Sequence, residues 1–205
     1  MNRDKLKALE SAFMLDYPLG FESEEIQMIS KKHKVEKMRA YVLDNFSEDD
    51  FEDERLVSER FTKLISMSSL VSVFEKARYR DVSKNFEPDE TQQLSRGIQE
   101  FLYGNQALGF DLMVSVLERH KLAKWPILTV LGVYMYPDVE VLVKPTTAKS
   151  VLNYFEVSDF KYVSKPSYFF YKCFREFINE LKSEVNKSLQ VDNAAFCGFL
   201  MMTIQ

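Results

Sequence analysis

The stretch KLAKWPILTVLGVYMYPDVEVLVKPTTAK, residues 121–149, decides the fold class and raises the main question about function. Its apolar residues between Ile127 and Met135 recur at the spacing of a buried helix. Pro126 suits the first turn of that helix, and Pro137 ends it. The stretch also holds the only tryptophan of the chain and four lysines. It is therefore either a binding site or a part of the scaffold.

The second half of this stretch has the only strand-like pattern in the chain. Three valines alternate with other residues along 139–144, and Pro145 ends the run. A lone strand cannot form a sheet, so three alternatives stay open. The segment pairs with another chain, pairs with residues 161–163, or is an extended loop. We expect Thr146 or Thr147 to cap the helix that follows.

Helical spacing dominates the rest of the chain. The expected helices span residues 6–13, 23–46, 57–74, 88–104, 106–120, 146–155, 167–189 and 192 onward. Ser66, Ser68 and Ser69 are expected to divide the range 57–74 into two helices. We expect the basic-aromatic segment 74–81 to be a loop or a helix end. The sequence therefore predicts a mainly α protein, a compact multi-helix domain with at most one or two short strands.

Length and composition favour a single folded unit. The chain has 205 residues, of which 46% are hydrophobic, so it can bury a sizeable core without disulfides or metal. We expect an N-terminal helical region, 1–65, and a main helical domain, 66–205, packed together as one unit. Cys173 and Cys197 lie in apolar helical patterns, which is typical of reduced, buried thiols in a cytoplasmic protein. We expect neither a secretory signal nor a membrane span.

The charge distribution argues against a dominant nucleic-acid binder. Net charge is −4, and the acidic excess lies in the first hundred residues, whereas such binders usually have a basic excess. Six carboxylates crowd the segment SEDDFEDER, residues 47–55. We interpret it as the charged start of a helix capped by Ser47, and the alternative is a metal-binding or DNA-mimicking surface. A calcium loop is excluded because no glycine lies between Gly20 and Gly97.

Residue types exclude several enzyme classes. The chain has no GxGxxG, GxxxxGK[ST] or GxSxG motif, and His33 and His120 are its only histidines. We therefore expect no cofactor and no metal, and we lean towards a protein that is not an enzyme. Asp138, Glu140 and Lys144 have some likeness to the PD…(D/E)xK elements of metal-dependent nucleases, but their spacing differs. A carboxylate site built on Asp138 and Glu140 stays open as an alternative.

Six basic residues and the single tryptophan form the candidate binding site. If they converge, they make an anion-binding or nucleic-acid-binding surface with an aromatic platform. Lys144 would also lie at a helix N-terminus, where the dipole favours anions. The alternative is that Trp125 anchors the core and the basic residues are ordinary surface. The candidates are Arg78, Arg80, Lys121, Lys124, Trp125, Lys144 and Lys149.

Two resemblances add expectations. The blocks FEKARYRD (74–81), LYGNQALGFD (102–111), KLAKWP (121–126), VKPTTAK (143–149) and FCGFLMM (196–202) resemble the recurring blocks of a group of bacterial proteins without assigned activity. That resemblance covers about residues 65–205 and implies one compact domain from about Ser66, with a variable helical region before it. It implies no reaction.

The second resemblance is to the final part of helix-hairpin-helix DNA glycosylases. An apolar helix, Tyr-Pro-Asp, a short extended piece and another helix follow one another in both. The chain lacks the hairpin glycines, and Lys144 and Pro145 stand where the family's acid is expected, so catalysis does not carry over. We therefore expect a non-catalytic module of the bacterial cytoplasm that binds protein or nucleic acid. The alternatives are a nucleic-acid-acting protein with glycosylase-like topology and an enzyme with a carboxylate site.

Overall fold

The protein is a helical assembly, as its sequence predicts. The computed structural model describes residues 2–204 and is 73% helical. Eleven α-helices and three short 3₁₀ helices (η) make up its regular structure, and no β-strand occurs within those residues. The mainly α fold class is confirmed.

The elements follow one another with short connections. The first part of the chain forms α1 (Arg3–Asp16), η1 (Gly20–Glu22), α2 (Glu24–His33), α3 (Val35–Asn45), η2 (Glu48–Glu52), α4 (Glu54–Met67) and α5 (Val73–Ser83). The second part forms α6 (Pro88–Tyr103), α7 (Gln106–Arg119), α8 (Trp125–Met135), α9 (Pro145–Tyr154), α10 (Tyr168–Ser183), η3 (Lys187–Leu189) and α11 (Asn193–Thr203).

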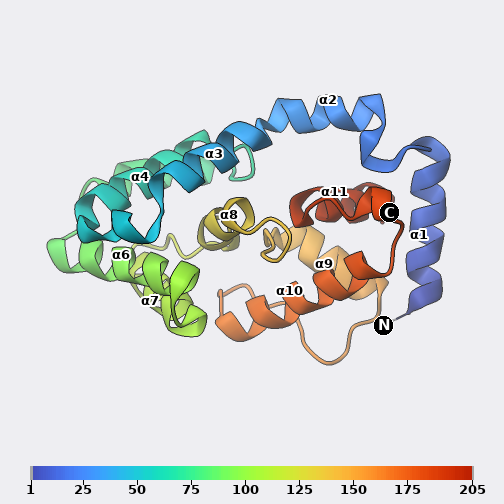
Figure 1. The fold of residues 1–205 in the computed structure, drawn as a ribbon. Coiled ribbons are helices and arrows are strands. Elements are labelled where there is room, and N and C mark those ends of the chain that lie inside the picture. Colours follow the sequence, from blue (N-terminus) through green and yellow to red (C-terminus); the bar gives the residue numbers. More distant parts are fainter. Residues whose placement is uncertain (1, 205) are drawn as a thin grey trace.

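The helices surround α8, which lies near the middle of the molecule (Figure 1). At one end α6 packs along α7 and against α4, and at the other end α11 contacts α1, α9 and α10. Helices α2 and α3 run along one edge and join the two ends (Figure 1). One hydrophobic core extends from Leu6 to Leu200. The expected boundary between residues 65 and 66 falls inside α4, so that helix belongs to both expected regions.

Local chemistry sets many helix ends where the sequence predicts them. Pro88 begins α6 and Gly104 follows its last residue. The Asp192 side chain caps α11 by accepting a hydrogen bond from the backbone of Ala195 at 2.7 Å. Within the acidic segment 47–55, Ser47 and its third following residue form a capping box. These carboxylates therefore begin helical segments, which is the preferred interpretation of that segment.

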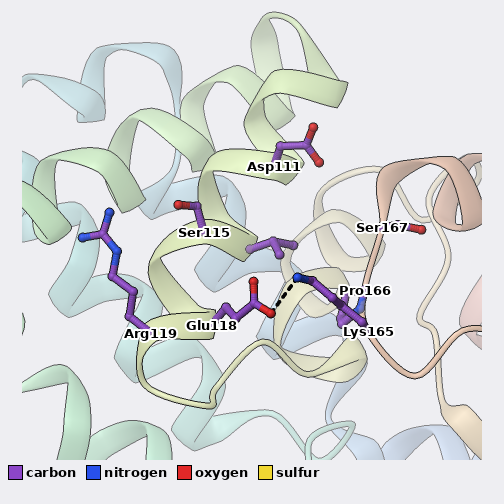
Figure 2. Close-up of a pocket in the computed structure, with 8 residues that line it drawn as sticks. Asp111, Ser115, Glu118, Arg119, Lys165, Pro166 and Ser167 are labelled. Atoms are coloured by element: carbon purple, nitrogen blue, oxygen red, sulfur yellow. Dashed lines mark ion pairs between the residues drawn. The ribbon is translucent and has the colours of Figure 1, made fainter.

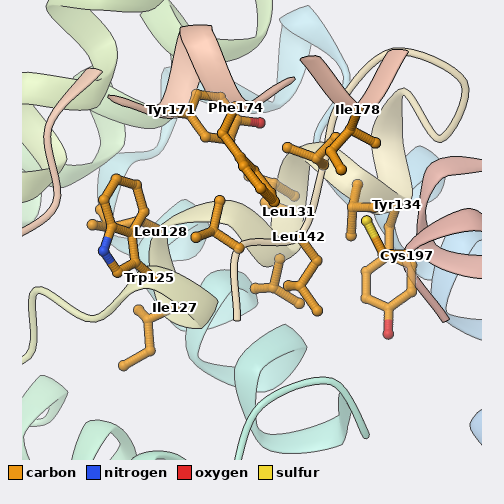
Figure 3. Packing of buried hydrophobic residues seen from close by; sticks show 14 of the residues in the cluster. Trp125, Ile127, Leu128, Leu131, Tyr134, Leu142, Tyr171, Phe174, Ile178 and Cys197 are labelled. Atoms are coloured by element: carbon orange, nitrogen blue, oxygen red, sulfur yellow. The ribbon is translucent and has the colours of Figure 1, made fainter. Parts of the chain in front are cut away.

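Helix α8 is the centre of the core. All of its residues from Trp125 to Tyr134 are buried. Figure 3 shows its side chains packed against Tyr171, Phe174 and Ile178 of α10 and against Cys197 of α11. A helix that is apolar on every side is stable only when other elements cover all of it. The surrounding helices do so.

Several expected boundaries are wrong. The expected helix 23–46 is two helices, because Lys34 adopts a left-handed conformation (φ 52°) and redirects the chain. The segment 74–81 is neither loop nor helix end but lies within α5. Lys144, rather than a threonine, is the N-cap of α9, since Pro145 already occupies the first turn. The helix expected over 167–189 ends at Ser183.

The strand-like segment forms no strand. Residues 140–144 have no regular structure, and Glu140, Val141, Leu142 and Val143 are all buried. Alternation predicts one buried and one exposed side, but this segment passes through the core and is covered on both sides. Of the three alternatives, the extended loop is the one observed.

Side chains replace the missing sheet partners of this segment. The backbone oxygens of Asp138 and Val139 accept hydrogen bonds from Lys182 Nζ (3.0 Å) and Asn179 Nδ2 (2.8 Å). The backbone oxygen of Glu140 accepts one from the Asn193 amide at 3.1 Å. Val143 N donates to the Thr129 hydroxyl at 3.1 Å, and Asn193 N donates to the oxygen of Pro137. A buried backbone group without a partner costs free energy, so these contacts allow an irregular segment inside the core.

The side chain of Glu140 is the centre of a buried polar network. Its carboxylate accepts hydrogen bonds from Gln106 Nε2 (2.9 Å), Arg175 Nη1 (2.6 Å) and the hydroxyl of Tyr171. Burial, together with the Glu140 charge, raises the pKa of Tyr171 well above its usual value, which keeps the hydroxyl protonated as a donor. Gln106 also accepts from Tyr168 at 3.0 Å. The network joins α7, α10 and the segment before α9.

We predict that Arg175→Met destabilises the protein by about 3–5 kcal/mol, because it leaves the Glu140 carboxylate buried without its cationic partner. Urea unfolding followed by circular dichroism measures this difference. The double variant Glu140→Gln/Arg175→Met removes both charges and should recover a large part of the loss. A loss below about 1 kcal/mol in Arg175→Met would show that water or another group compensates Glu140.

Candidate binding surface

Helix α5 presents the most exposed aromatic side chain of the described residues. Ser72 and Glu75 form a capping box that begins the helix, and Tyr79 lies completely buried on its inner side. Phe74 then points outward and is 88% exposed, and its neighbour Val73 is 76% exposed. Single exposed apolar residues are common, and we call these two exposed neighbours the apolar patch of α5.

Basic residues border this patch on one side. Arg78 lies one helical turn after Phe74, so the two side chains share a face. Arg78 Nη2 donates a hydrogen bond to the backbone oxygen of His120 at 3.4 Å, which brings it to the turn between α7 and α8. Exposed Lys121 follows directly in that turn. We call Val73, Phe74, Arg78 and Lys121 the α5 face.

Two other expected basic residues have separate positions. Arg80 is two residues after Arg78, which turns it about 200° around the helix, away from Arg78. Its Nε lies 3.6 Å from Asp81 Oδ1, an exposed ion pair on the same helix. Lys124 is exposed as the N-cap residue of α8, in the same turn as Lys121. Lys124 therefore shares the turn that Arg78 contacts, and Arg80 points away from it.

Trp125 lies in the core. It is only 2% exposed, packs against Phe110 and Phe170, and donates from Nε1 to the backbone oxygen of Val163 at 2.9 Å. A buried ring offers no open face to a ligand, so Trp125 has the scaffold role that the sequence left as the alternative. Trp125, the aromatic residue expected to contact a ligand, instead packs against other side chains of the core. Phe74 is an aromatic residue that is exposed.

Lys144 and Lys149 lie at the start of α9 and within it. Lys144 precedes α9 as its N-cap, and Lys149 Nζ lies 4.9 Å from the ring centre of Tyr162. A small hollow of about 70 Å³ opens beside Thr146 and Thr147 and is bounded by the end of α11. Arg78 thus contacts the α7–α8 turn, whereas Lys149 contacts Tyr162 and Lys144 begins α9.

An open groove of about 640 Å³ runs between α7 and the start of α10 (Figure 2). Asp111, Ser115 and Glu118 line it from α7, and Lys165 and Ser167 line it from the other side. Charges of both signs border the groove, and Lys165 Nζ already pairs with Glu118 Oε1 at 2.7 Å. The charged groups are thus partly neutralised by one another, and the groove has no single charge preference.

The carboxylates considered for catalysis do not form a site. Asp138 is exposed, whereas Glu140 is 3% exposed and its carboxylate accepts hydrogen bonds from three side chains in the core. His120 is similarly engaged, since its Nε2 lies 2.8 Å from Oε1 of buried Glu90. Burial raises the pKa of Glu90, while hydrogen bonds from Glu87 N and His120 outweigh it and hold that pKa below its usual value. These groups bind one another rather than converge on a cavity.

Within residues 2–204 no group of three or more potential ligand side chains could hold a metal ion. Over the same residues, no helix combines the length and the apolar character that crossing a membrane requires. Comparison of the chain with protein-family models, curated proteins and solved structures finds no match.

Sequence reasoning missed the exposed role of Phe74. The basic-aromatic block 74–81 does single out this helix, but periodicity there is ambiguous because apolar and charged residues are mixed. The serine-to-glutamate spacing of Ser72 and Glu75 is a capping-box signal that predicts the helix start. With that start and Tyr79 as the inner residue, Phe74 falls on the outer side.

We predict unequal reactivity of the two thiols. Burial raises the pKa of Cys197 to about 12, and the side chain is almost inaccessible, so its thiolate is scarce. Burial, with the Glu176 charge, also raises the pKa of Cys173, but that residue is only partly buried. Iodoacetamide at pH 8 should therefore modify Cys173 first, as mass spectrometry of peptides can measure.

The variant Cys173→Ser should take up almost no reagent while folded and one equivalent in concentrated denaturant. Equal labelling rates of the two thiols in the folded wild type would contradict the expected burial of Cys197.

Proposed function

We propose that this chain is a non-catalytic interaction module that binds a protein partner through the α5 face. The observation that carries the proposal is the exposure of Phe74 and its neighbour Val73. Tyr79 of the same helix is buried and attaches α5 to the core, so Phe74 is not needed for that role. Complete burial of a phenylalanine side chain is worth about 1.5–3 kcal/mol, and the fold leaves this contribution unused. A partner that covers Phe74 would gain it.

The border of the patch indicates the chemistry of the partner. Arg78 follows Phe74 by one helical turn and reaches the α7–α8 turn, which holds exposed Lys121 and Lys124. A protein segment with an apolar anchor flanked by carboxylates would complement this arrangement. A protein partner is favoured over nucleic acid, because the net charge is −4 and Val73 adds an apolar side chain that phosphates do not need.

Nucleic-acid binding, including a glycosylase-like topology, is the alternative proposal. An exposed Phe74 with Arg78 and Lys121 also has the elements of a stacking platform for single-stranded nucleic acid. We further propose that the chain belongs to the bacterial group whose FEKARYRD block it resembles, since that block supplies most of α5. A cytoplasmic location is part of this proposal, and two free cysteines support it.

Selection from a displayed random-peptide library tests the proposal. Peptides that bind the wild type should share an aromatic or aliphatic residue flanked by Asp or Glu. They should lose at least about 2 kcal/mol of binding, roughly 30-fold in Kd, on the variant Phe74→Asp. The matched control is Phe169→Asp, the same change at another exposed phenylalanine (69%), which should leave binding unchanged.

Both variants should unfold within about 0.5 kcal/mol of the wild type, since both side chains lie mostly in solvent. Fluorescence anisotropy with a single-stranded oligonucleotide is the second arm. Salt-sensitive binding that disappears in Arg78→Glu/Lys121→Glu would favour the nucleic-acid alternative. Peptide binding that does not depend on Phe74 would overturn the proposal.

A further inference from the structure

Helix α2 receives little support from its own chain. None of its ten residues is buried, and its main neighbour is the short η1 segment just before it. An isolated helix of this length is marginal in water, and helices in proteins are stabilised mostly by packing of an apolar face. In Figure 1, α2 forms the outer edge of the molecule between α1 and α3. Its outer side is therefore open to a partner.

The two sides of α2 differ in their contacts. Ile26 packs against the core, and His33 Nδ1 lies 2.8 Å from the hydroxyl of Ser69, so these residues face the body of the protein. At about 100° per residue, Met28 falls on the opposite side. Met28 is 57% exposed. An apolar side chain thus lies at the middle of the outer face of α2.

Charged residues are arranged symmetrically around Met28. Glu24 and Glu25 precede it by four and three residues, and Lys31 and Lys32 follow it by three and four. All four are exposed and lie within about 60° of Met28 around the helix. None of the four forms an ion pair within residues 2–204. We call these five residues the α2 face.

The acidic and basic pairs cannot meet within one helix. Seven residues, or about 10 Å along the helix axis, separate Glu24 from Lys31. An antiparallel second helix with the same sequence solves this problem, because it reverses the order of the charges. A twofold axis at Met28 places Glu24 opposite Lys32 of the other copy and Glu25 opposite Lys31. It also brings the two Met28 side chains together.

We propose that a second copy of this chain docks on the α2 face, with the two α2 helices antiparallel about a twofold axis at Met28. The contact is isologous, so it closes after two copies and leaves no open α2 face. One short helix from each copy gives an interface at the low end of known sizes, below about 1,200 Å². The association is therefore weak and sensitive to salt.

The helix dipole gives a separate reason for part of this pattern. Acidic residues in the first turn and basic residues in the last turn stabilise any helix. That effect acts within one molecule and needs neither Met28 on the same face nor equal spacing on both sides of it. The experiment must therefore distinguish an effect within one chain from one between two chains.

Two charge-reversed variants make this distinction. Glu24→Lys/Glu25→Lys has four cationic residues on the α2 face, and Lys31→Glu/Lys32→Glu has four anionic ones. Sedimentation equilibrium over a wide concentration series should show wild-type dimers that weaken at high salt, monomers for each variant alone, and dimers again when the two variants are mixed. The control Glu176→Lys/Glu180→Lys changes the net charge as the first variant does, but on exposed positions of α10, and should associate as the wild type does.

A wild type that stays monomeric throughout the series, or a mixture that does not associate, overturns the proposal.

Charge reversal also weakens the favourable interaction of these residues with the dipole of their own helix. A second experiment therefore tests the geometry and leaves all four charges unchanged. Met28→Cys, in a Cys173→Ser background, should form an interchain disulfide when oxidised glutathione takes up the two electrons and is reduced. Ser30→Cys, on the inner side of α2, is the matched control and should form much less. Equal cross-linking of the two variants contradicts the twofold axis at Met28.

Discussion

The extended segment 140–144, buried from Glu140 to Val143, together with the turn 137–139 before it, is the constraint on which the rest of the structure depends. It carries backbone polar groups through an apolar core without a neighbouring strand. Asn179 and Lys182 of α10 and Asn193 of α11 donate to three successive carbonyl oxygens of this segment. Those helices must therefore be in place for the segment to be buried at low cost. Its burial therefore depends on the assembly of α8, α10 and α11 around it.

The buried polar groups near this segment bind one another. The Glu140 carboxylate and the Arg175 guanidinium satisfy each other, with Gln106 and Tyr171 completing the network. Burial lowers the pKa of Lys182, whose ammonium group binds a backbone oxygen. Charged groups that could resemble catalytic residues in the sequence thus stabilise the scaffold. The two proposed binding surfaces, the α5 face and the α2 face, lie outside this network.

Local rules predicted much of the helical framework. Pro88, Gly104 and Asp192 fix helix ends by chemistry that acts within a few residues, and the structure has those ends as expected. The apolar spacing of 127–135 predicted α8 correctly, because a helix buried on all sides needs apolar residues throughout. Of the candidate residues, Arg78 contacts the α7–α8 turn that holds Lys121 and Lys124, Lys144 and Lys149 belong to the start of α9, and Trp125 is buried, because side-chain contacts between elements cannot be read from spacing along one element.

The sequence by itself determined the mainly α fold class and most helix positions. Only the tertiary structure decided which aromatic residue is buried: Trp125 fills the core and Phe74 remains in solvent, although basic residues occur within two positions of each. It also decided that the alternating valines form a loop and that Lys34 breaks a helix. Periodicity describes one element at a time, whereas burial depends on which other elements cover each side of it.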